Sequence, residues 1–163
     1  MDFREIALMS ESEEREHWWI QTRFFYIDKA IEQLLHLCNK FQVVEFGCGT
    51  AQNLWYIRNR SPFRDHIERL VGVDPYLPGN FVPDWLTASD QLTNRLNSNE
   101  TVDLILGMDV LEHIDDHESA LREWSSYLSS RGLMLLTVPA FSFLWSQHDV
   151  FLVTRDGIQN RNS

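Results

Sequence analysis

The chain has 163 residues, of which 44% are hydrophobic and 23% charged, and its formal net charge is -10. These values are typical of one globular domain, and the negative charge argues against binding to a nucleic-acid backbone, which needs clustered Lys and Arg. No apolar run reaches the ~20 residues of a membrane-spanning helix, and the first residues have no basic region before an apolar core. We therefore expect a cytoplasmic protein without a membrane span.

The first quarter of the chain predicts a long helix followed by a strand. Apolar and aromatic residues recur at helical spacing from about Ser12 to Cys38, after a capping box at residues 10–13. The segment from Phe41 to Phe46 is short and apolar, which is typical of a strand covered on both faces. A second helix is expected from Ala51 to Arg60, where a Ser-Pro pair stops it.

The remaining predicted elements continue this alternation. They are a strand at 69–74, a short third strand at 84–87, a fourth strand at 102–107, a helix that Asp115 or Asp116 caps and that runs to about Ser130, and a fifth strand at 133–138. Strands that alternate with helices form βαβ units. The sequence therefore predicts an α/β fold with a Rossmann-like, doubly wound, mostly parallel sheet behind an N-terminal helix.

Two glycines stand one residue apart directly after the first predicted strand, in the spacing Glu45-x-Gly47-x-Gly49-x-Ala51. Glycine permits a tight turn and a close approach of a ligand to the backbone, and a helix N-terminus offers free N–H groups. This loop predicts a site for a nucleotide-like cofactor. A P-loop would end in Gly-Lys-Ser/Thr, and a nicotinamide-binding loop would have glycine where Gln52 stands, so both are disfavoured.

The loop resembles the first motif of class I S-adenosylmethionine-dependent methyltransferases. Residues 71–74 resemble the second motif, residues 103–114 the fourth-strand segment of a small-molecule methyltransferase subfamily, and residues 131–140 its fifth strand. The resemblance spans residues 17–150. It implies direct displacement, in which a small-molecule or lipid-like acceptor takes the methyl group of S-adenosylmethionine.

The resemblance also implies roles for individual residues. Glu45 would bind the ammonium of the cofactor, Asp74 its ribose hydroxyls, and the N–H groups of the loop its carboxylate. Ser89 and Asp90 are candidates for contact with adenine. The cofactor-binding residues implied in this way are Glu45, Gly47, Cys48, Gly49, Asp74, Pro75, Ser89, Met108 and Asp109.

Two histidines are candidates for a catalytic base. If an oxygen or nitrogen acceptor needs a base, His113 or His148 would take its proton. For His148, a purely structural hydrogen bond explains the residue as well as a catalytic role does. For His113, ordering of the loop after the fourth strand is preferred to a catalytic role. Although His117 stands four residues after His113, the aspartates between them are better explained as helix caps, so we expect no metal.

The end of the chain departs from the resemblance. Such folds usually carry seven strands, whereas residues 150–153 offer one short strand and the polar tail at 156–163 predicts none. We expect a C-terminally truncated domain that lacks the usual last strands and leaves its fifth strand as an exposed edge for a homodimer or a partner. The alternative function is a non-catalytic cofactor-binding or partner-binding protein. The single domain then divides into an N-terminal helix at 12–38, a cofactor-binding core at 41–139 and a short extension at 140–163.

Overall fold

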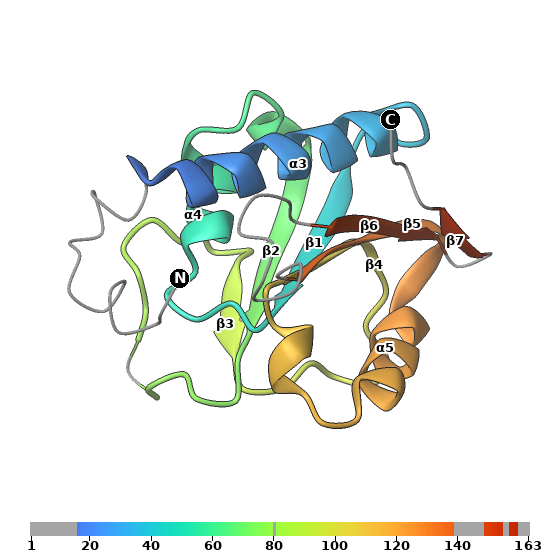
Figure 1. Cartoon of the computed structure of the whole chain (residues 1–163). Helices are drawn as coiled ribbons and strands as arrows, with labels where there is room; N and C mark the ends of the chain where they lie inside the picture. The colour runs from blue at the N-terminus through green and yellow to red at the C-terminus, as the bar shows by residue number, and fades with distance from the viewer. Residues whose placement is uncertain (1–15, 80, 139–148, 155–156, 160–163) are drawn as a thin grey trace.

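The computed structural model describes residues 16–79, 81–138, 149–154 and 157–159, the last two segments as backbone. Seven strands form one sheet in the order β3-β2-β1-β4-β5-β6-β7 (Figure 1). The strands are β1 (Phe41–Phe46), β2 (Ile67–Val73), β3 (Gln91–Thr93), β4 (Val102–Met108), β5 (Leu128–Val138), β6 (Asp149–Thr154) and β7 (Gly157–Gln159). The helices are α3 (Trp18–Leu35), α4 (Gln52–Asn59) and α5 (His117–Ser126), with short 3-10 turns η1 (Arg64–His66) and η2 (Leu111–His113).

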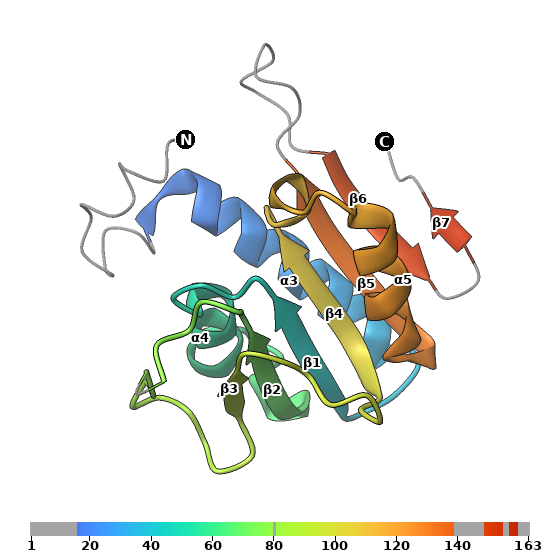
Figure 2. The same ribbon diagram turned by 90° about the horizontal axis from the view of Figure 1, so that it is seen from below.

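Helices cover both faces of the sheet. Along β1, Phe41 and Val43 pack into the core formed with α3 and α4, whereas Val44 and Phe46 pack into the core formed with α5. Figure 2 shows α5 on one face of the sheet and α3 on the other. Strands β1 to β5 are mutually parallel. The Rossmann-like parallel fold is thus confirmed, and burial on both faces explains the continuous apolar strands. Among the described residues, no helix is long and apolar enough to cross a membrane.

The N-terminal helix α3 begins at Trp18, later than the expected start near Ser12. The backbone of His17 is extended, with φ -65° and ψ 133°, and its ring Nδ1 accepts a hydrogen bond from the amide of Trp19 at 3.3 Å. This cap satisfies one of the free N–H groups of the first turn. The capping box at residues 10–13 lies outside the described residues.

The third strand lies at Gln91–Thr93 and not at residues 84–87, so that prediction is wrong. The carboxylate of Asp90 accepts hydrogen bonds from the backbone N–H groups of Thr87, at 3.0 Å, and of Leu70, at 2.9 Å. These bonds close a turn over the segment predicted as a strand and attach it to β2. Pairing with β2 therefore starts only after Asp90.

The helix before β5 is shorter than expected and the strand is longer. Asp116 caps α5, as predicted, because its Oδ1 accepts a hydrogen bond from the amide of Ser119 at 3.0 Å. The helix ends at Ser126, since the carbonyl of Tyr127 accepts a hydrogen bond from the amide of Val102 on β4 at 2.9 Å. The chain thus joins the sheet at Leu128, before the predicted strand start.

The sheet continues beyond β5, which corrects two expectations. Strand β6 pairs antiparallel with β5 along the whole segment Leu133–Val138, and β7 pairs antiparallel with β6. The expected short strand at 150–153 is therefore present, but a second one follows it in the tail. Because β6 occupies the hydrogen-bonding edge of β5, the prediction of an exposed fifth-strand edge that recruits a partner is wrong.

Candidate functional site

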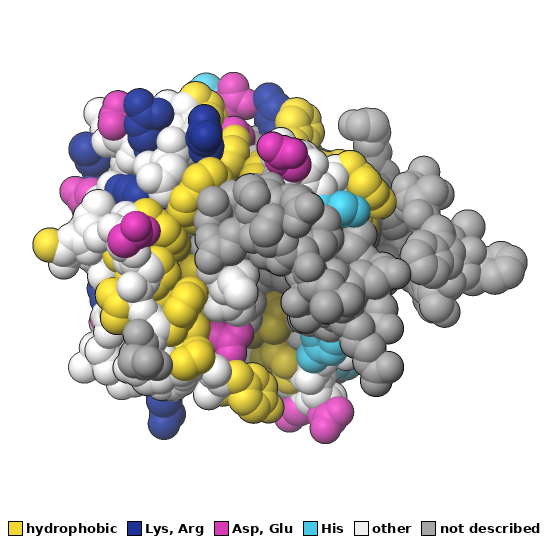
Figure 3. Space-filling model, turned by 90° about the vertical axis from the view of Figure 1, so that its left-hand side faces the viewer, with side chains coloured by type: hydrophobic (Ala, Val, Ile, Leu, Met, Phe, Trp, Pro, Cys, Tyr) yellow, Lys and Arg dark blue, Asp and Glu magenta, His cyan; other side chains and the backbone are white. Residues whose placement is uncertain are grey.

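The carboxyl ends of β1, β2 and β4 meet at one edge of the sheet. β1 lies between β2 and β4, so the strand order reverses at β1, and ligands of open parallel sheets bind at such a point. The face shown in Figure 3 carries a recess with hydrophobic side chains on its floor and an acidic side chain at its margin. A small pocket of about 170 Å³ lies elsewhere, beside the amino ends of β4 and β5.

Glu45 lies near the end of β1 and is only 1% exposed. Its Oε1 accepts a hydrogen bond from Nδ2 of Asn53 on α4 at 2.6 Å, whereas its Oε2 has no partner among the described residues. Burial raises the pKa of Glu45 to about 7, although the hydrogen bond from Asn53 and the positive charge of Arg23 oppose that rise. A buried carboxylate oxygen without a donor is costly. This position therefore suits a positively charged group of a ligand.

The two loop glycines meet different surroundings. Gly47 has φ +70°, and a Cβ added to it would lie 2.4 Å from Cγ2 of Val110, so the loop packs tightly on the segment after β4. Gly49 has φ +49°, and a Cβ added there would have no heavy atom within 4 Å. The space over Gly49 is thus open, and a ligand could approach the backbone there.

Most amide groups of this loop turn inward. The amides of Gly47 and Cys48 donate to the carbonyl of Val73 at 2.8 and 3.3 Å, and the amide of Gly49 donates to Oδ2 of Asp74 at 3.0 Å. These bonds fasten the loop to the end of β2. The loop amides that we expected to bind a ligand carboxylate are therefore largely occupied within the protein.

Asp74 follows β2 and faces this loop. Its Oδ2 accepts the bond from Gly49, and its Oδ1 accepts a hydrogen bond from the amide of Tyr76 at 2.9 Å. A carboxylate offers about four acceptor positions, so both oxygens of Asp74 can accept a further hydrogen bond. Pro75, beside it, is exposed.

Asp109, directly after β4, joins three elements. Its Oδ1 accepts a hydrogen bond from the hydroxyl of Thr137 on β5 at 2.7 Å, and its Oδ2 accepts one from Nε1 of Trp19 on α3 at 3.0 Å. Nη2 of Arg23 forms an ion pair with the same Oδ2. Asp109 adopts φ 54°, a left-handed conformation that is uncommon outside glycine. α3 is thereby attached to the carboxyl edge of the sheet.

A family profile described as a methyltransferase domain matches residues 13–159, which is most of the chain. This chain belongs to that family of methyltransferase domains. No curated protein sequence matches it.

Solved structures share the fold of this methyltransferase domain at low sequence identity. The plantazolicin methyltransferase BpumL, in complex with a pentazolic desmethylPZN analog and S-adenosylhomocysteine, is 21% identical with a TM-score of 0.62 over 83% of this chain and 52% of its own. An S-adenosylmethionine-dependent methyltransferase from Clostridium acetobutylicum is 16% identical, with a TM-score of 0.56 over 84% of this chain and 57% of its own. Coclaurine N-methyltransferase, bound to N-methylheliamine and S-adenosylhomocysteine, is 16% identical, with a TM-score of 0.52 over 73% of this chain and 36% of its own. This chain thus covers between 36% and 57% of the length of these three proteins.

Two residues suggested for adenine contact lie in the loop before β3 of the methyltransferase domain. The side chain of Asp90 is fully buried, and Arg58 binds both of its oxygens, at 3.0 Å through Nε and 2.5 Å through Nη2. Burial alone would raise the pKa of Asp90, but the hydrogen bonds from Arg58, Thr87 and Leu70 hold it below its usual value. Asp90 therefore fixes this loop. Ser89 is exposed, with its hydroxyl 3.0 Å from that of Thr87, and stays a prediction for ligand contact.

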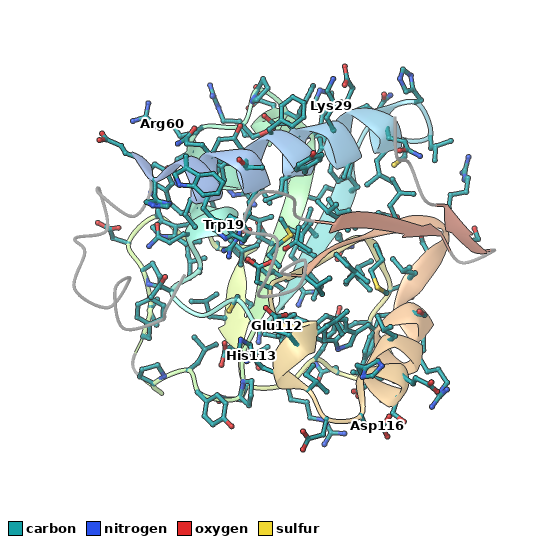
Figure 4. The ribbon with its side chains drawn as sticks, viewed as in Figure 1. Trp19, Lys29, Arg60, Glu112, His113 and Asp116 are labelled. Carbon is teal, nitrogen blue, oxygen red and sulfur yellow. The ribbon has the colours of Figure 1, made fainter. Side chains whose placement is uncertain are left out.

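Of the two candidate bases, the structure describes His113, which lies on the surface of the methyltransferase domain. His113 belongs to η2, its side chain is 55% exposed, and its Nε2 lies 4.0 Å from Oε1 of Glu112. Burial raises the pKa of Glu112. In Figure 4, Glu112 and His113 approach the site from the side opposite Trp19. His148 lies outside the described residues.

Two further predicted residues are buried. Cys48 is 6% exposed and burial raises the pKa of its thiol, so it is a filler and not a reactive thiolate. Met108 is 4% exposed at the end of β4. The sequence reasoning missed Arg23, although a signal existed: Arg23 follows Ile20 by three residues and precedes Ile27 by four, which places a cation on the apolar stripe of the helix.

Proposed function

We propose that this methyltransferase domain binds S-adenosylmethionine at the carboxyl edge of β1, β2 and β4 and transfers its methyl group to an acceptor. The observation that carries the proposal is the unpartnered, buried Oε2 of Glu45 at the end of β1, and the open space over Gly49 in the following loop supports it. The fold similarity to proteins whose structures hold S-adenosylhomocysteine supports the same assignment. The acceptor that we propose is a small or lipid-like molecule, an expectation that rests on the aromatic residues at 141–145.

The residues at this edge fit the charge pattern of the cofactor. Glu45 would bind its ammonium, and the remaining acceptor positions of Asp74 would receive the hydroxyls of its ribose. A side chain at position 49 would fill the space that the cofactor needs. When bound, S-adenosylmethionine supplies a methyl group on a positively charged sulfur, which an acceptor can take by direct displacement without further activation.

The ionisation of Glu45 couples to binding. With a pKa of about 7, the side chain is only partly ionised at neutral pH in the free protein. A cation placed beside a carboxylate favours its charged form. Binding of the ammonium would therefore complete the ionisation of Glu45 and release a proton near pH 7.

The acceptor would approach from the side of η2. His113 is exposed there and would take the proton that an oxygen or nitrogen acceptor loses. Glu112, beside it, would hold the imidazole in place. A carbon or sulfur acceptor that is already anionic would make this base unnecessary.

The test is an assay for release of S-adenosylhomocysteine across classes of acceptor. We expect release with at least one small or lipid-like acceptor, and we expect Asp74→Ala to abolish it. Asp65→Ala, which removes an exposed carboxylate on η1, is the matched control and should leave release unchanged. Tight binding of S-adenosylmethionine without release by any class would favour the non-catalytic alternative.

A further inference from the structure

The connection between β2 and β3 carries the two most exposed large hydrophobic side chains among the described residues. Tyr76 is 90% exposed and Val82 is 75% exposed. They belong to residues 75–79 and 81–83, which carry no charged side chain and which we call the apolar loop. In Figure 2 this connection projects beyond β3, the edge strand of the sheet. Single exposed apolar side chains are common on proteins, but a group of them on an uncharged segment marks a contact surface.

The apolar loop is held in place from its inner side. Leu77 packs against the core formed with α3 and α4. The side-chain nitrogen of Asn94, just after β3, donates a hydrogen bond to the carbonyl of Asp74 at 3.1 Å. The same nitrogen donates to the carbonyls of Pro75, at 3.3 Å, and of Leu77, at 3.4 Å. Tyr76 stands between these attached residues, so its ring points away from the core.

Most backbone donors of the apolar loop are absent or are used within the loop. Three positions have no N–H group because they are prolines: Pro75, Pro78 and Pro83. The amides of Tyr76 and Leu77 donate to the side chain and the carbonyl of Asp74, at 2.9 and 3.3 Å, and the amide of Phe81 donates to the carbonyl of Pro78 at 2.9 Å.

This internal pairing favours a lipid partner over a protein partner. A segment that enters the edge of a lipid layer must satisfy its backbone polar groups internally, because the lipid chains offer no donors or acceptors. A protein partner supplies hydrogen bonds of its own and does not need this arrangement. Tyrosine, with an apolar ring and a polar hydroxyl, is also enriched at the boundary between lipid and water.

The charges of the protein select the kind of lipid. Anionic headgroups attract segments rich in Lys and Arg, whereas the charged residues that flank the apolar loop, Asp74 and Asp84, are both acidic. The whole chain has a net charge of -10. An anionic lipid surface would therefore repel this face, and a zwitterionic surface without net charge would accept it.

We propose that the apolar loop docks on the surface of a zwitterionic lipid bilayer, into which Tyr76 and Val82 insert. The loop directly follows Asp74, so docking would bring the carboxyl edge of the sheet close to the lipid. The inference rests on the proposed function for its consequence, that a lipid-like acceptor would reach the site from this layer.

The test is cosedimentation of the full chain with phosphatidylcholine vesicles. We expect wild type to bind, and we expect the double variant Tyr76→Ser, Val82→Ser to lower the partition coefficient about tenfold or more, because two apolar side chains are lost from the contact. Both positions are exposed, so urea unfolding should be nearly unchanged. Leu37→Ser is the matched control: it removes a side chain that is 42% exposed beside the pocket at the amino ends of β4 and β5, and it should bind like wild type.

The other outcomes separate this inference from its alternatives. Vesicles that contain phosphatidylserine should bind more weakly, and binding that requires this lipid would overturn the inference. Absence of wild-type binding, or equal binding by the double variant, would also overturn it. A dimer in sedimentation velocity without lipid, lost in the double variant, would assign the surface to a second copy of the chain instead. S-adenosylhomocysteine binding is measured on the same preparations: its absence, with vesicle binding retained, would overturn the proposed function and leave the docking surface standing.

Discussion

Replacement of Glu45 by Gln should make the stability of this protein less dependent on pH. The carboxylate is 1% exposed, and burial is the main cause that raises its pKa from the usual 4.5 to about 7. The folded state therefore binds this proton more tightly than the unfolded state does. The free energy of unfolding consequently falls as the pH rises from about 4.5 to about 7, and it levels off above that range.

The size of the effect follows from the difference between the two pKa values. One pKa unit corresponds to about 1.4 kcal/mol, so ionisation of Glu45 costs the folded state about 3 kcal/mol by pH 8. Gln has the same shape and keeps an acceptor for Nδ2 of Asn53, but it does not titrate. The new amide of Gln can also donate to Oδ1 of Asn53, which has no partner among the described residues.

The measurement is urea unfolding of wild type and Glu45→Gln at several pH values between 5 and 8. The free energy of unfolding of the variant, relative to wild type, should rise by about 2–3 kcal/mol across this range, which is about 1–2 M in urea midpoint. Glu68→Gln, at an exposed position on β2, is the control and should give a difference that does not change with pH. A pH-independent difference for Glu45→Gln would refute the reasoning.

Four further substitutions separate stability, ligand binding and turnover. Gly47→Ala places a Cβ 2.4 Å from Val110 in a left-handed conformation and should lower the free energy of unfolding by about 2–4 kcal/mol; a loss under ~1 kcal/mol would contradict the packing. Gly49→Ala adds only conformational strain, about 1–2 kcal/mol, but should weaken S-adenosylhomocysteine binding at least about tenfold, equivalent to ~1.4 kcal/mol; unchanged affinity would place the ligand elsewhere. Asp90→Ala removes the ion-pair partner of Arg58 and should cost about 3–5 kcal/mol in urea unfolding; a loss under ~1 kcal/mol would contradict the structural role of the pair. His113→Ala should slow methyl transfer without changing cofactor affinity, and unchanged turnover would exclude it as the base.

Local pattern was enough to locate the strands that form the middle of the sheet. The first strand matches the predicted segment 41–46. The fourth strand begins where it was predicted, at residue 102, and ends one residue later than predicted, at Met108. Both are apolar runs bounded by polar residues or glycine, and neighbours on both sides bury them. For such strands the sequence pattern and the tertiary structure agree.

The errors lie where a single side chain decides the backbone course. Asp90 closes a turn through Thr87 and Leu70, so the chain cannot extend over 84–87, and no periodicity reveals this. Strand β7 comes from the polar tail, where the local sequence signal is weak, and only its pairing with β6 makes it a strand.

The candidate site was predictable in part. The spacing of Glu45, Gly47 and Gly49 located the loop, because acid, turn and helix start are adjacent in sequence. The inward direction of the loop amides depends on β2, which is remote in sequence, and could not be predicted from the loop alone. Arg23 meets Asp109 across the fold, a pairing between positions separated by 86 residues. Such contacts follow only from the packing of α3 on the sheet.

The central claim is that the carboxyl edge of this sheet binds S-adenosylmethionine, and calorimetric titration tests it most directly. We predict that S-adenosylhomocysteine binds to one site per chain, that S-adenosylmethionine competes for that site, and that NAD produces no binding. Absence of heat with both adenosyl ligands, or binding of NAD at the same site, would contradict the account.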